Sequence, residues 1–94
     1  MAVPVAGRAT CETAGIAERL AIEEVRLSKV YIRAEGDNTG GVYLGDMNVS
    51  AVSGQTRGLL LEPGDQVTFD SVNLFDWWID AETSGDGVEL MGLA

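Results

Sequence analysis

Short runs of alternating apolar and polar residues recur along this chain of 94 residues. The run Lys29–Ala34 has aliphatic residues at every second position, which is the period of a β-strand with one buried face. Further strands are predicted at 42–44, 47–52, 66–70, 74–81 and 88–91, and the apolar run 59–61 leads into the turn at 62–65. Turn-forming residues separate them at intervals of about ten residues, a spacing typical of antiparallel sheets. We therefore predict an all-β fold, a small antiparallel β-sandwich or barrel of about 6–8 short strands.

Turn residues predict how some of these strands are connected. The polar segment after Lys29–Ala34 is expected to return the chain as Val42–Leu44 in a β-hairpin. Asn38 and Gly40 are residue types that accept positive φ in such a turn. The segment Pro63–Gly64 predicts a type II turn, in which proline presets φ and glycine takes a positive value.

Residues 1–15 show no usable period and are rich in small residues. We predict that they form an extended N-terminal arm outside a single β-sandwich domain at 16–94. The arm is either a disordered terminus or a segment that orders on a neighbouring subunit, with Val3, Pro4 and Val5 as an apolar anchor. We expect it to be dispensable for folding but needed for binding to a particle.

Five segments within residues 16–94 together form a characteristic series of turns and core positions: Lys29–Ala34, Asn38–Gly45, Leu61–Thr68, Trp78–Ala81 and Gly85–Val88. Together they resemble small β-sandwich proteins of tailed bacteriophages, which are encoded among virion genes and described as capsid decoration, cement or head-fibre proteins. The resemblance implies a β-sandwich and a structural role in the virion. It implies no active site, because its motifs are turns and core positions.

Residues 16–28 carry conflicting signals. Helix-forming residues are frequent, and Arg19 and Glu23 would be i,i+4 neighbours on a helix. The apolar positions in the second half fit the alternation of a strand instead. The resemblance also implies a strand near Ala17–Leu20, a loop at Glu23–Glu24 and a strand that begins at Leu27. We predict strand and loop for this segment.

Composition narrows the class of partner. Fifteen acidic and six basic residues give a net charge of -9. Nucleic acid and anionic membranes require clustered cations, so neither is an expected partner. The chain has no histidine, the commonest general base and a common zinc ligand. No apolar run approaches the roughly 20 residues that span a bilayer.

The single cysteine, Cys11, excludes an intramolecular disulfide. We expect a reduced thiol rather than an intermolecular disulfide. No secretory signal is recognised at the N-terminus. These features predict a protein made in the cytoplasm, and the resemblance implies that its final location is the virion, assembled in the host cytoplasm.

Carboxyl groups are the remaining source of chemistry. The candidates for a paired acid–base site are Asp70, Asp76, Asp80, Glu82 and Asp86. Most of them fall at turns or on the exposed side of predicted strands, which is typical of solubilising acids. A calcium site would use Asp37, Asn38 and Asp46, but their spacing matches no calcium loop. We predict no catalytic residue, no metal ligand and no cofactor.

Trp77 and Trp78 are adjacent, so on one strand their side chains point to opposite faces. Trp77 shares its face with Ile79 and is predicted to lie in the core. Trp78 would lie outside beside Asp80, where it could pack on a neighbouring subunit, lie under the arm, or bind a sugar together with Tyr43.

These features and the resemblance predict a non-enzymatic structural protein of the virion. The preferred role is a capsid decoration or cement protein that binds the major capsid protein or other virion subunits. The predicted partner-binding residues are Val3, Pro4, Val5, Tyr43 and Trp78. A homo-oligomer is expected, and a trimer would suit the threefold positions of a shell. The alternatives are a head-fibre, neck or tail accessory protein and, from another class, a carbohydrate-binding module for host attachment.

Overall fold

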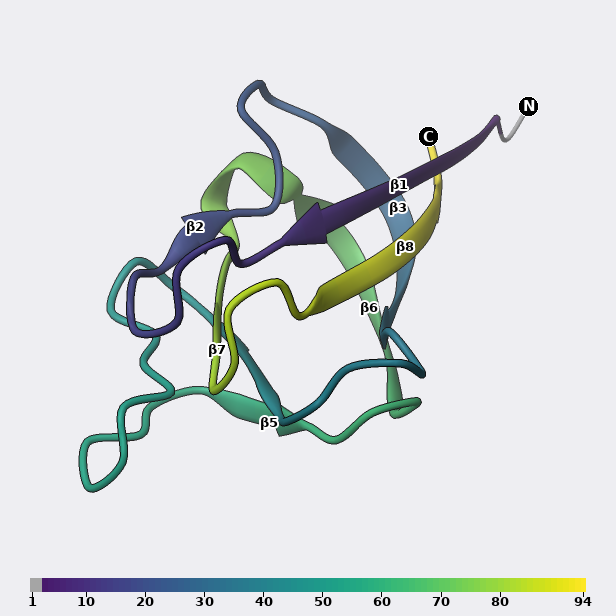
Figure 1. Cartoon of the computed structure of the whole chain (residues 1–94). Helices are drawn as coiled ribbons and strands as arrows, with labels where there is room; N and C mark the ends of the chain where they lie inside the picture. Colours follow the sequence, from purple (N-terminus) through teal and green to yellow (C-terminus); the bar gives the residue numbers. More distant parts are fainter. Residues whose placement is uncertain (1–2) are drawn as a thin grey trace.

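The computed structural model describes residues 3–94 and shows a sandwich of two antiparallel sheets, as predicted (Figure 1). Its elements are β1 (Pro4–Thr10), β2 (Glu18–Arg19), β3 (Arg26–Ala34), β4 (Val42–Gly45), β5 (Leu59–Leu61), β6 (Gln66–Asn73), the 3₁₀ turn η1 (Leu74–Asp76), β7 (Trp78–Ala81) and β8 (Gly87–Leu93). Sheet A has the strand order β1-β8-β3-β6, and sheet B has the order β2-β7-β4-β5.

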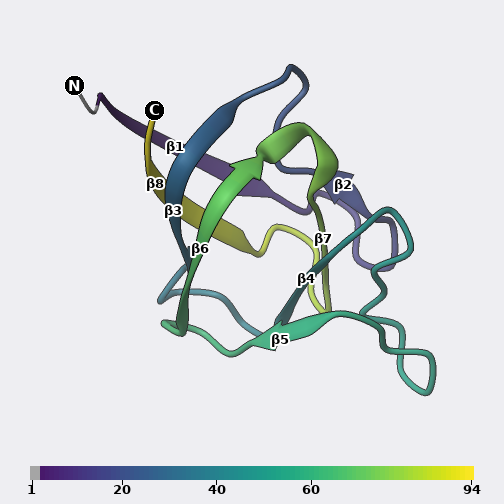
Figure 2. The ribbon, with the colours of Figure 1, turned by 180° about the vertical axis from the view of Figure 1, so that it is seen from behind.

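The strand order is that of one long antiparallel hairpin rolled around itself. From the β4–β5 connection outward, the pairs are β4–β5, β3–β6, β2–β7 and β1–β8. Rolling the hairpin brings β3 beside β8 and β4 beside β7, so that each pair continues into a sheet. Figure 2 shows the four strands of sheet A on one side and those of sheet B on the other. This is jelly-roll topology, a common architecture for antiparallel proteins.

The core lies between the sheets and is built from alternating aliphatic residues. Sheet A contributes Ala9, Leu27, Val30, Ile32, Ala34, Val72, Val88 and Leu90, and sheet B contributes Val42, Leu44, Leu61, Ile79 and Ala81. Val67 and Phe69 of β6 pack against this cluster, as the alternation predicts. The inward face changes between Val30 and Leu27, beside Ser71, whose positive φ of 53° bends the neighbouring strand.

Residues 4–10 do not form a separate arm, and this prediction was wrong. They form β1, which pairs with β8 from Pro4↔Leu93 to Thr10↔Gly87. Small residues hide the alternation of this strand, but Ala9 and the following Cys11 are buried in the core. Residues 4–15 are therefore not expected to be dispensable for folding. Met1 and Ala2, also part of the predicted arm, lie outside the described residues.

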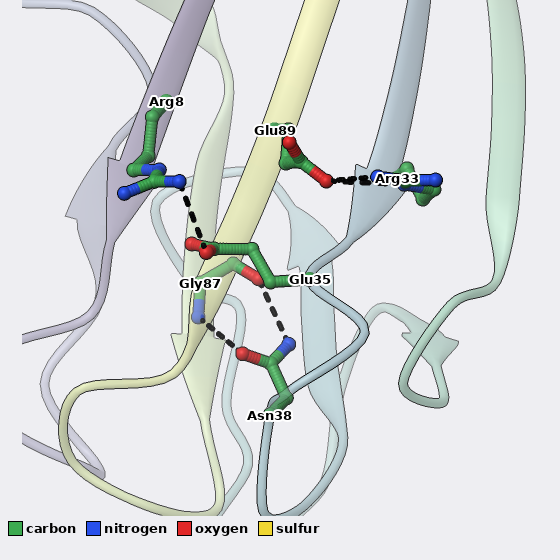
Figure 3. A network of polar contacts seen from close by, with 6 residues as sticks. All are labelled: Arg8, Arg33, Glu35, Asn38, Gly87 and Glu89. Carbon is green, nitrogen blue, oxygen red and sulfur yellow. Dashed lines mark hydrogen bonds and ion pairs between the residues drawn. The ribbon is translucent and has the colours of Figure 1, made fainter.

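The predicted hairpin between 29–34 and 42–44 is also wrong, because β3 lies in sheet A and β4 in sheet B. The connection 35–41 crosses from one sheet to the other, and neither Asn38 nor Gly40 takes a positive φ. Asn38 instead uses its side-chain amide. Its Nδ2 donates to the carbonyl of Gly87 (2.9 Å), and its Oδ1 accepts from the N–H of Gly87 (3.1 Å) (Figure 3).

Other expected strands are confirmed or shortened. In 16–28 the short strand, the loop and the start of β3 agree with the prediction. Segment 47–52 is a loop, in which Asp46 Oδ1 accepts from the N–H of Asn48 (2.9 Å). The start of 74–81 is η1, because Asn73 caps it by accepting from the N–H of Phe75. The predicted turn at 63–64 is present, with φ of 87° at Gly64.

Candidate functional site

The structure divides the predicted partner-binding residues between the two sheets. Val3, Pro4 and Val5 lie at the start of β1 beside the C-terminus. Val3 is 53% exposed, and Val5 is half-buried. Trp78 and Tyr43 belong to sheet B, where Val42 and Leu44 point into the core and Tyr43 points outward. The five residues therefore do not form one site.

Trp78 lines a shallow surface pocket on the outer side of sheet B. The residues around this Trp78 pocket are Arg19, Asp46, Met47, Asn48, Phe75, Asp76 and Trp78. They come from β2, η1, β7 and the loop after β4, so the rolled hairpin brings them together. Met47 is 68% exposed, whereas Trp78 is half-buried rather than exposed as predicted.

Arg19 organises the aromatic part of this pocket. Its guanidinium carbon lies 3.9 Å from the centroid of the Phe75 ring and 4.8 Å from that of Trp78. The pairing of β2 with β7 sets Arg19 opposite Trp78. Phe75 comes three residues before Trp78, on the 3₁₀ turn that leads into β7. These are cation–π contacts, and they cover part of the ring surface of Trp78.

Trp77 points toward the interior, as predicted. It packs against the core cluster, and its ring centroid lies 4.6 Å from that of Phe69, with 58° between the ring planes. The opposite directions of Trp77 and Trp78 thus follow the strand alternation, although Trp77 itself lies between η1 and β7.

Asp80 is completely buried, which contradicts its predicted exposed position. One carboxyl oxygen accepts from the N–H groups of Gly15 and Ala81, each at 2.9 Å, and from the thiol of Cys11 at 3.6 Å. The other oxygen accepts from the N–H of Ala51 at 2.8 Å. Asp80 therefore fixes the loop 11–17 and the loop 46–58 over the outer face of sheet B.

Two further acids fix the β3–β4 crossover. Asp86 is buried and accepts from the N–H groups of Thr39 and Gly40, with the shortest distance 2.9 Å. Glu82 accepts from the N–H of Gly41 at 2.7 Å. Asp80, Glu82 and Asp86 thus bind backbone donors. Their carboxyl oxygens form hydrogen bonds that hold the loops in place.

Cys11 is fully buried next to Asp80. Burial, together with the nearby Asp80 carboxyl group, raises the pKa of the thiol from 9.0 to about 11. The thiol is therefore protonated at neutral pH and donates hydrogen bonds, including one to the carbonyl of Thr13 at 3.3 Å. In this position Cys11 is not available for a disulfide with another chain.

The remaining candidate acids lie apart from one another. Asp70 forms an ion pair with Lys29 (3.7 Å), and Asp76 lies in the first turn of η1. Within residues 3–94, no three Cys, Asp or Glu side chains are grouped closely enough to hold a metal ion. The described part of the chain also contains no helix long and apolar enough to cross a membrane.

Comparison with known proteins gives no family assignment, because no protein-family model, curated protein or solved structure matches this chain. The structure alone therefore identifies the residues of the site.

Sequence reasoning missed Arg19 and the buried role of Asp80. Arg19 reaches Trp78 only through the pairing of β2 with β7, strands distant in sequence. No local pattern predicts this pairing, since β2 has two residues. Phe75 joins the pocket through the 3₁₀ turn η1, which replaces the start of the strand predicted at 74–81.

Proposed function

We propose that this protein is a non-enzymatic structural protein of a tailed-phage virion, a capsid decoration or cement protein that binds the assembled shell. The motifs at 29–34, 38–45 and 61–68 support the proposal by their resemblance to such proteins. Jelly-roll topology is compatible with this role, since it occurs in viral capsid proteins, but it also occurs in lectins. Fold therefore supports the proposal less than the surface does.

The observation that carries the proposal is the apolar character of the sheet B side. Several large apolar side chains on sheet B and its loops are exposed: Ile16 61%, Met47 68%, Val52 42%, Leu59 45% and Leu60 39%. Several exposed apolar side chains on one sheet and its loops favour a binding surface in that part of the molecule. In this proposal, the sheet B side, with Trp78 and Tyr43 on its outer face, contacts the major capsid protein or another virion subunit.

Binding would stabilise the shell by mass action. A protein that binds only the assembled state lowers the free energy of that state and not of free subunits. Burial of the apolar side chains supplies the favourable free energy. The net charge of -9 keeps unbound copies soluble.

Sedimentation with virions tests this function. The purified protein is mixed with particles of the phage or prophage whose genome encodes it, stripped of the protein where it is already present. We expect saturable co-sedimentation and a higher temperature of shell disruption. Met47→Ser should weaken binding. Ile22→Ser is the matched control, because Ile22 is 89% exposed but lies on the β2–β3 connection. No binding to any virion component, or equal loss in both variants, would contradict the proposal.

A carbohydrate-binding function has one observation in its favour. The Trp78 pocket combines aromatic rings with the polar groups of Asp46 and Asn48. However, the guanidinium of Arg19 covers part of the Trp78 ring that a sugar would need. Retention on host polysaccharide that is lost in Trp78→Ala, without binding to particles, would favour this function over shell binding.

A further inference from the structure

The outer edge of β1 carries unpaired backbone groups. At one end of the strand, Val3 and Ala94 exchange both of their backbone hydrogen bonds, at 3.4 and 2.9 Å. At the other end, the N–H of Cys11 donates to the carbonyl of Asp86 at 2.8 Å. Because hydrogen-bonding direction alternates along an antiparallel strand, the odd-numbered residues of β1 face β8. The even-numbered residues therefore direct their N–H and C=O groups away from the sheet.

These outward residues are Pro4, Ala6, Arg8 and Thr10, and all four are exposed. β1 is an edge strand of sheet A, with β8 as its one neighbour. No backbone hydrogen bond from another part of residues 3–94 reaches these four residues on their outward side. Proline lacks an N–H, so Pro4 occupies a position where no donor is needed for the pairing with β8. The edge still offers three donors and four acceptors, a template for another strand.

The other sheet edges are less suited to pairing. β2 has two residues and β5 has three. β6 is longer, but the positive φ of 53° at Ser71 interrupts its regular geometry, and Asp70 adds negative charge beside it. Among the described strands, β1 therefore has the longest regular open edge.

We propose that β1 pairs in antiparallel fashion with β1 of a second copy of this chain, about a twofold axis at Gly7. A twofold axis is required because the outward N–H and C=O groups of β1 in one copy must face those of β1 in the other. Centring at Gly7 pairs all seven residues, with Ala6 opposite Arg8 of the second copy and Pro4 opposite Thr10. Centring at Ala6 pairs only residues 4–8 of β1 with one another. Centring at Arg8 places two guanidinium groups opposite each other, which is unfavourable.

Side chains at the junction suit this register. Gly7 would meet Gly7 of the second copy at a pair without mutual hydrogen bonds, where Cα atoms approach to about 4.5 Å. On the inner side, half-buried Val5 would pack beside Ala9 of the second copy. Each such inner pair extends the core across the axis.

Charge permits this contact despite the net charge of -9. Arg8 lies 3.6 Å from Glu35, and Arg33 forms an ion pair with Glu89, the cross-strand neighbour of Arg8 (Figure 3). These two cations and two anions balance, so pairing at β1 brings no net charge to the junction. A strand of another protein could bond to the same backbone groups, but its side chains would also have to be complementary to those of β1. β1 of a second copy already has this complementarity.

The expected dimer is of moderate affinity. A single pair of seven-residue strands buries less than the roughly 1,600 Å² of a standard protein interface. We therefore expect dissociation in the micromolar range. The inference does not depend on the proposed function, since it concerns purified protein without particles.

Analytical ultracentrifugation over a series of concentrations tests the proposal. The wild-type protein should pass from monomer to dimer, and Ala6→Pro should weaken association by about tenfold or more, because it removes one outward donor per copy. Ala6→Ser is the matched control and should dimerise normally. A monomer at every concentration, a trimer, or equal affinity of Ala6→Pro and wild type would overturn the proposal.

Cysteine cross-linking tests the register independently of Ala6→Pro. Gly7→Cys should form a disulfide-linked dimer under mild oxidation, whereas Ala6→Cys and Arg8→Cys should not. A side chain fits at Gly7, since its Cβ would lie 3.5 Å from Leu90 Cδ1, an ordinary contact. Native Cys11 is buried and does not interfere. Cross-linking at position 6 or 8 but not at 7 would exclude the Gly7 axis.

Discussion

Sheets A and B use different means to remain folded. The strands of sheet A are seven to nine residues long, and its outer side carries exposed ion pairs such as Arg33–Glu89. The strands of sheet B have two to four residues. The loops 11–17 and 46–58 cover the part of its outer face around Asp80, which binds them. Sheet A is stabilised by long ladders of backbone hydrogen bonds between its strands. Sheet B is stabilised by a buried carboxyl group that joins loops to the sheet.

This difference shows how short strands become stable in a small jelly roll. Hydrogen bonds within a sheet of such short strands order few residues, so other contacts must fix the connections. Asp80, Glu82 and Asp86 do so by accepting hydrogen bonds from loop N–H groups. Within residues 3–94 no buried side-chain nitrogen or oxygen lacks a partner, so the network is complete. Variants in the two sheets should therefore fail in different ways.

The largest effect is expected at Asp80. Asp80→Ala leaves the N–H groups of Gly15 and Ala51 without an acceptor, at about 1–3 kcal/mol for each buried donor. Asp80→Asn retains one acceptor oxygen and should lose less stability. Urea unfolding measures both variants, and hydrogen exchange should rise first in 46–58. An unfolding free energy close to that of the wild type would show that these loops are not held by Asp80.

Trp77→Ala should have the next largest effect. The side chain is half-buried against Phe69, so we expect a loss of about 3 kcal/mol, at the low end for tryptophan truncation. Trp78→Ala should cost the isolated domain less, because Trp78 lies on the outer side of sheet B. Thermal melts compare the two. If Trp78→Ala proves the more damaging, the Trp78 pocket contributes more to folding than the core side of this strand.

In sheet A, close backbone approach is the sensitive feature. A Cβ at Gly87 would lie 2.2 Å from the carbonyl oxygen of Ala9, where β1 meets β8. Gly87→Ala should cost about 1–3 kcal/mol, as for other overpacking changes. Gly36→Ala is the control, since its Cβ would meet nothing within 4 Å. Equal melting temperatures for both variants would show that β1 can shift without cost.

The smallest effect is expected for the exposed pair Arg33–Glu89. The hydrogen bond and charge of Arg33 lower the pKa of Glu89 below its usual value. A lowered folded-state pKa adds stability above the usual carboxyl range, and this stability is lost as pH falls through the folded pKa. Solvent keeps the contribution small. In Arg33→Ala the NMR titration of Glu89 should return toward its ordinary value. An unchanged titration would assign the shift to another neighbour.

The sequence predicts where the strands of this fold lie along the chain better than it predicts which strands pair with each other. The alternation at 29–34 and 66–70, and the turn at 63–64, follow from local side-chain chemistry. The β3–β4 crossover does not, because a polar turn between two strands has the same composition whether they form a hairpin or lie in different sheets. β1 was missed since glycine and alanine give no periodic signal, although Ala9 is buried once β8 is present.

The candidate site was predicted only in part. The opposite directions of Trp77 and Trp78 follow from the period of a strand, which holds locally. The burial of Asp80 could not be predicted, because alternation assigns it to the outer face and says nothing of loops that cover that face. Arg19 joins the site through a contact between residues far apart in sequence.

The position of β8 in sheet A has a consequence for the order of folding during synthesis. β8 lies between β1 and β3 in the sheet, yet it follows all the other described strands in the sequence. Until Gly87–Leu93 have left the ribosome, β1 has no neighbour and the β8 side of β3 is open. The β4–β5 and β3–β6 pairs can form earlier, so the rolled hairpin closes from its middle outward. Sheet A therefore cannot be completed before β8 has emerged, and a chain stalled before Gly87 exposes strand edges that invite aggregation.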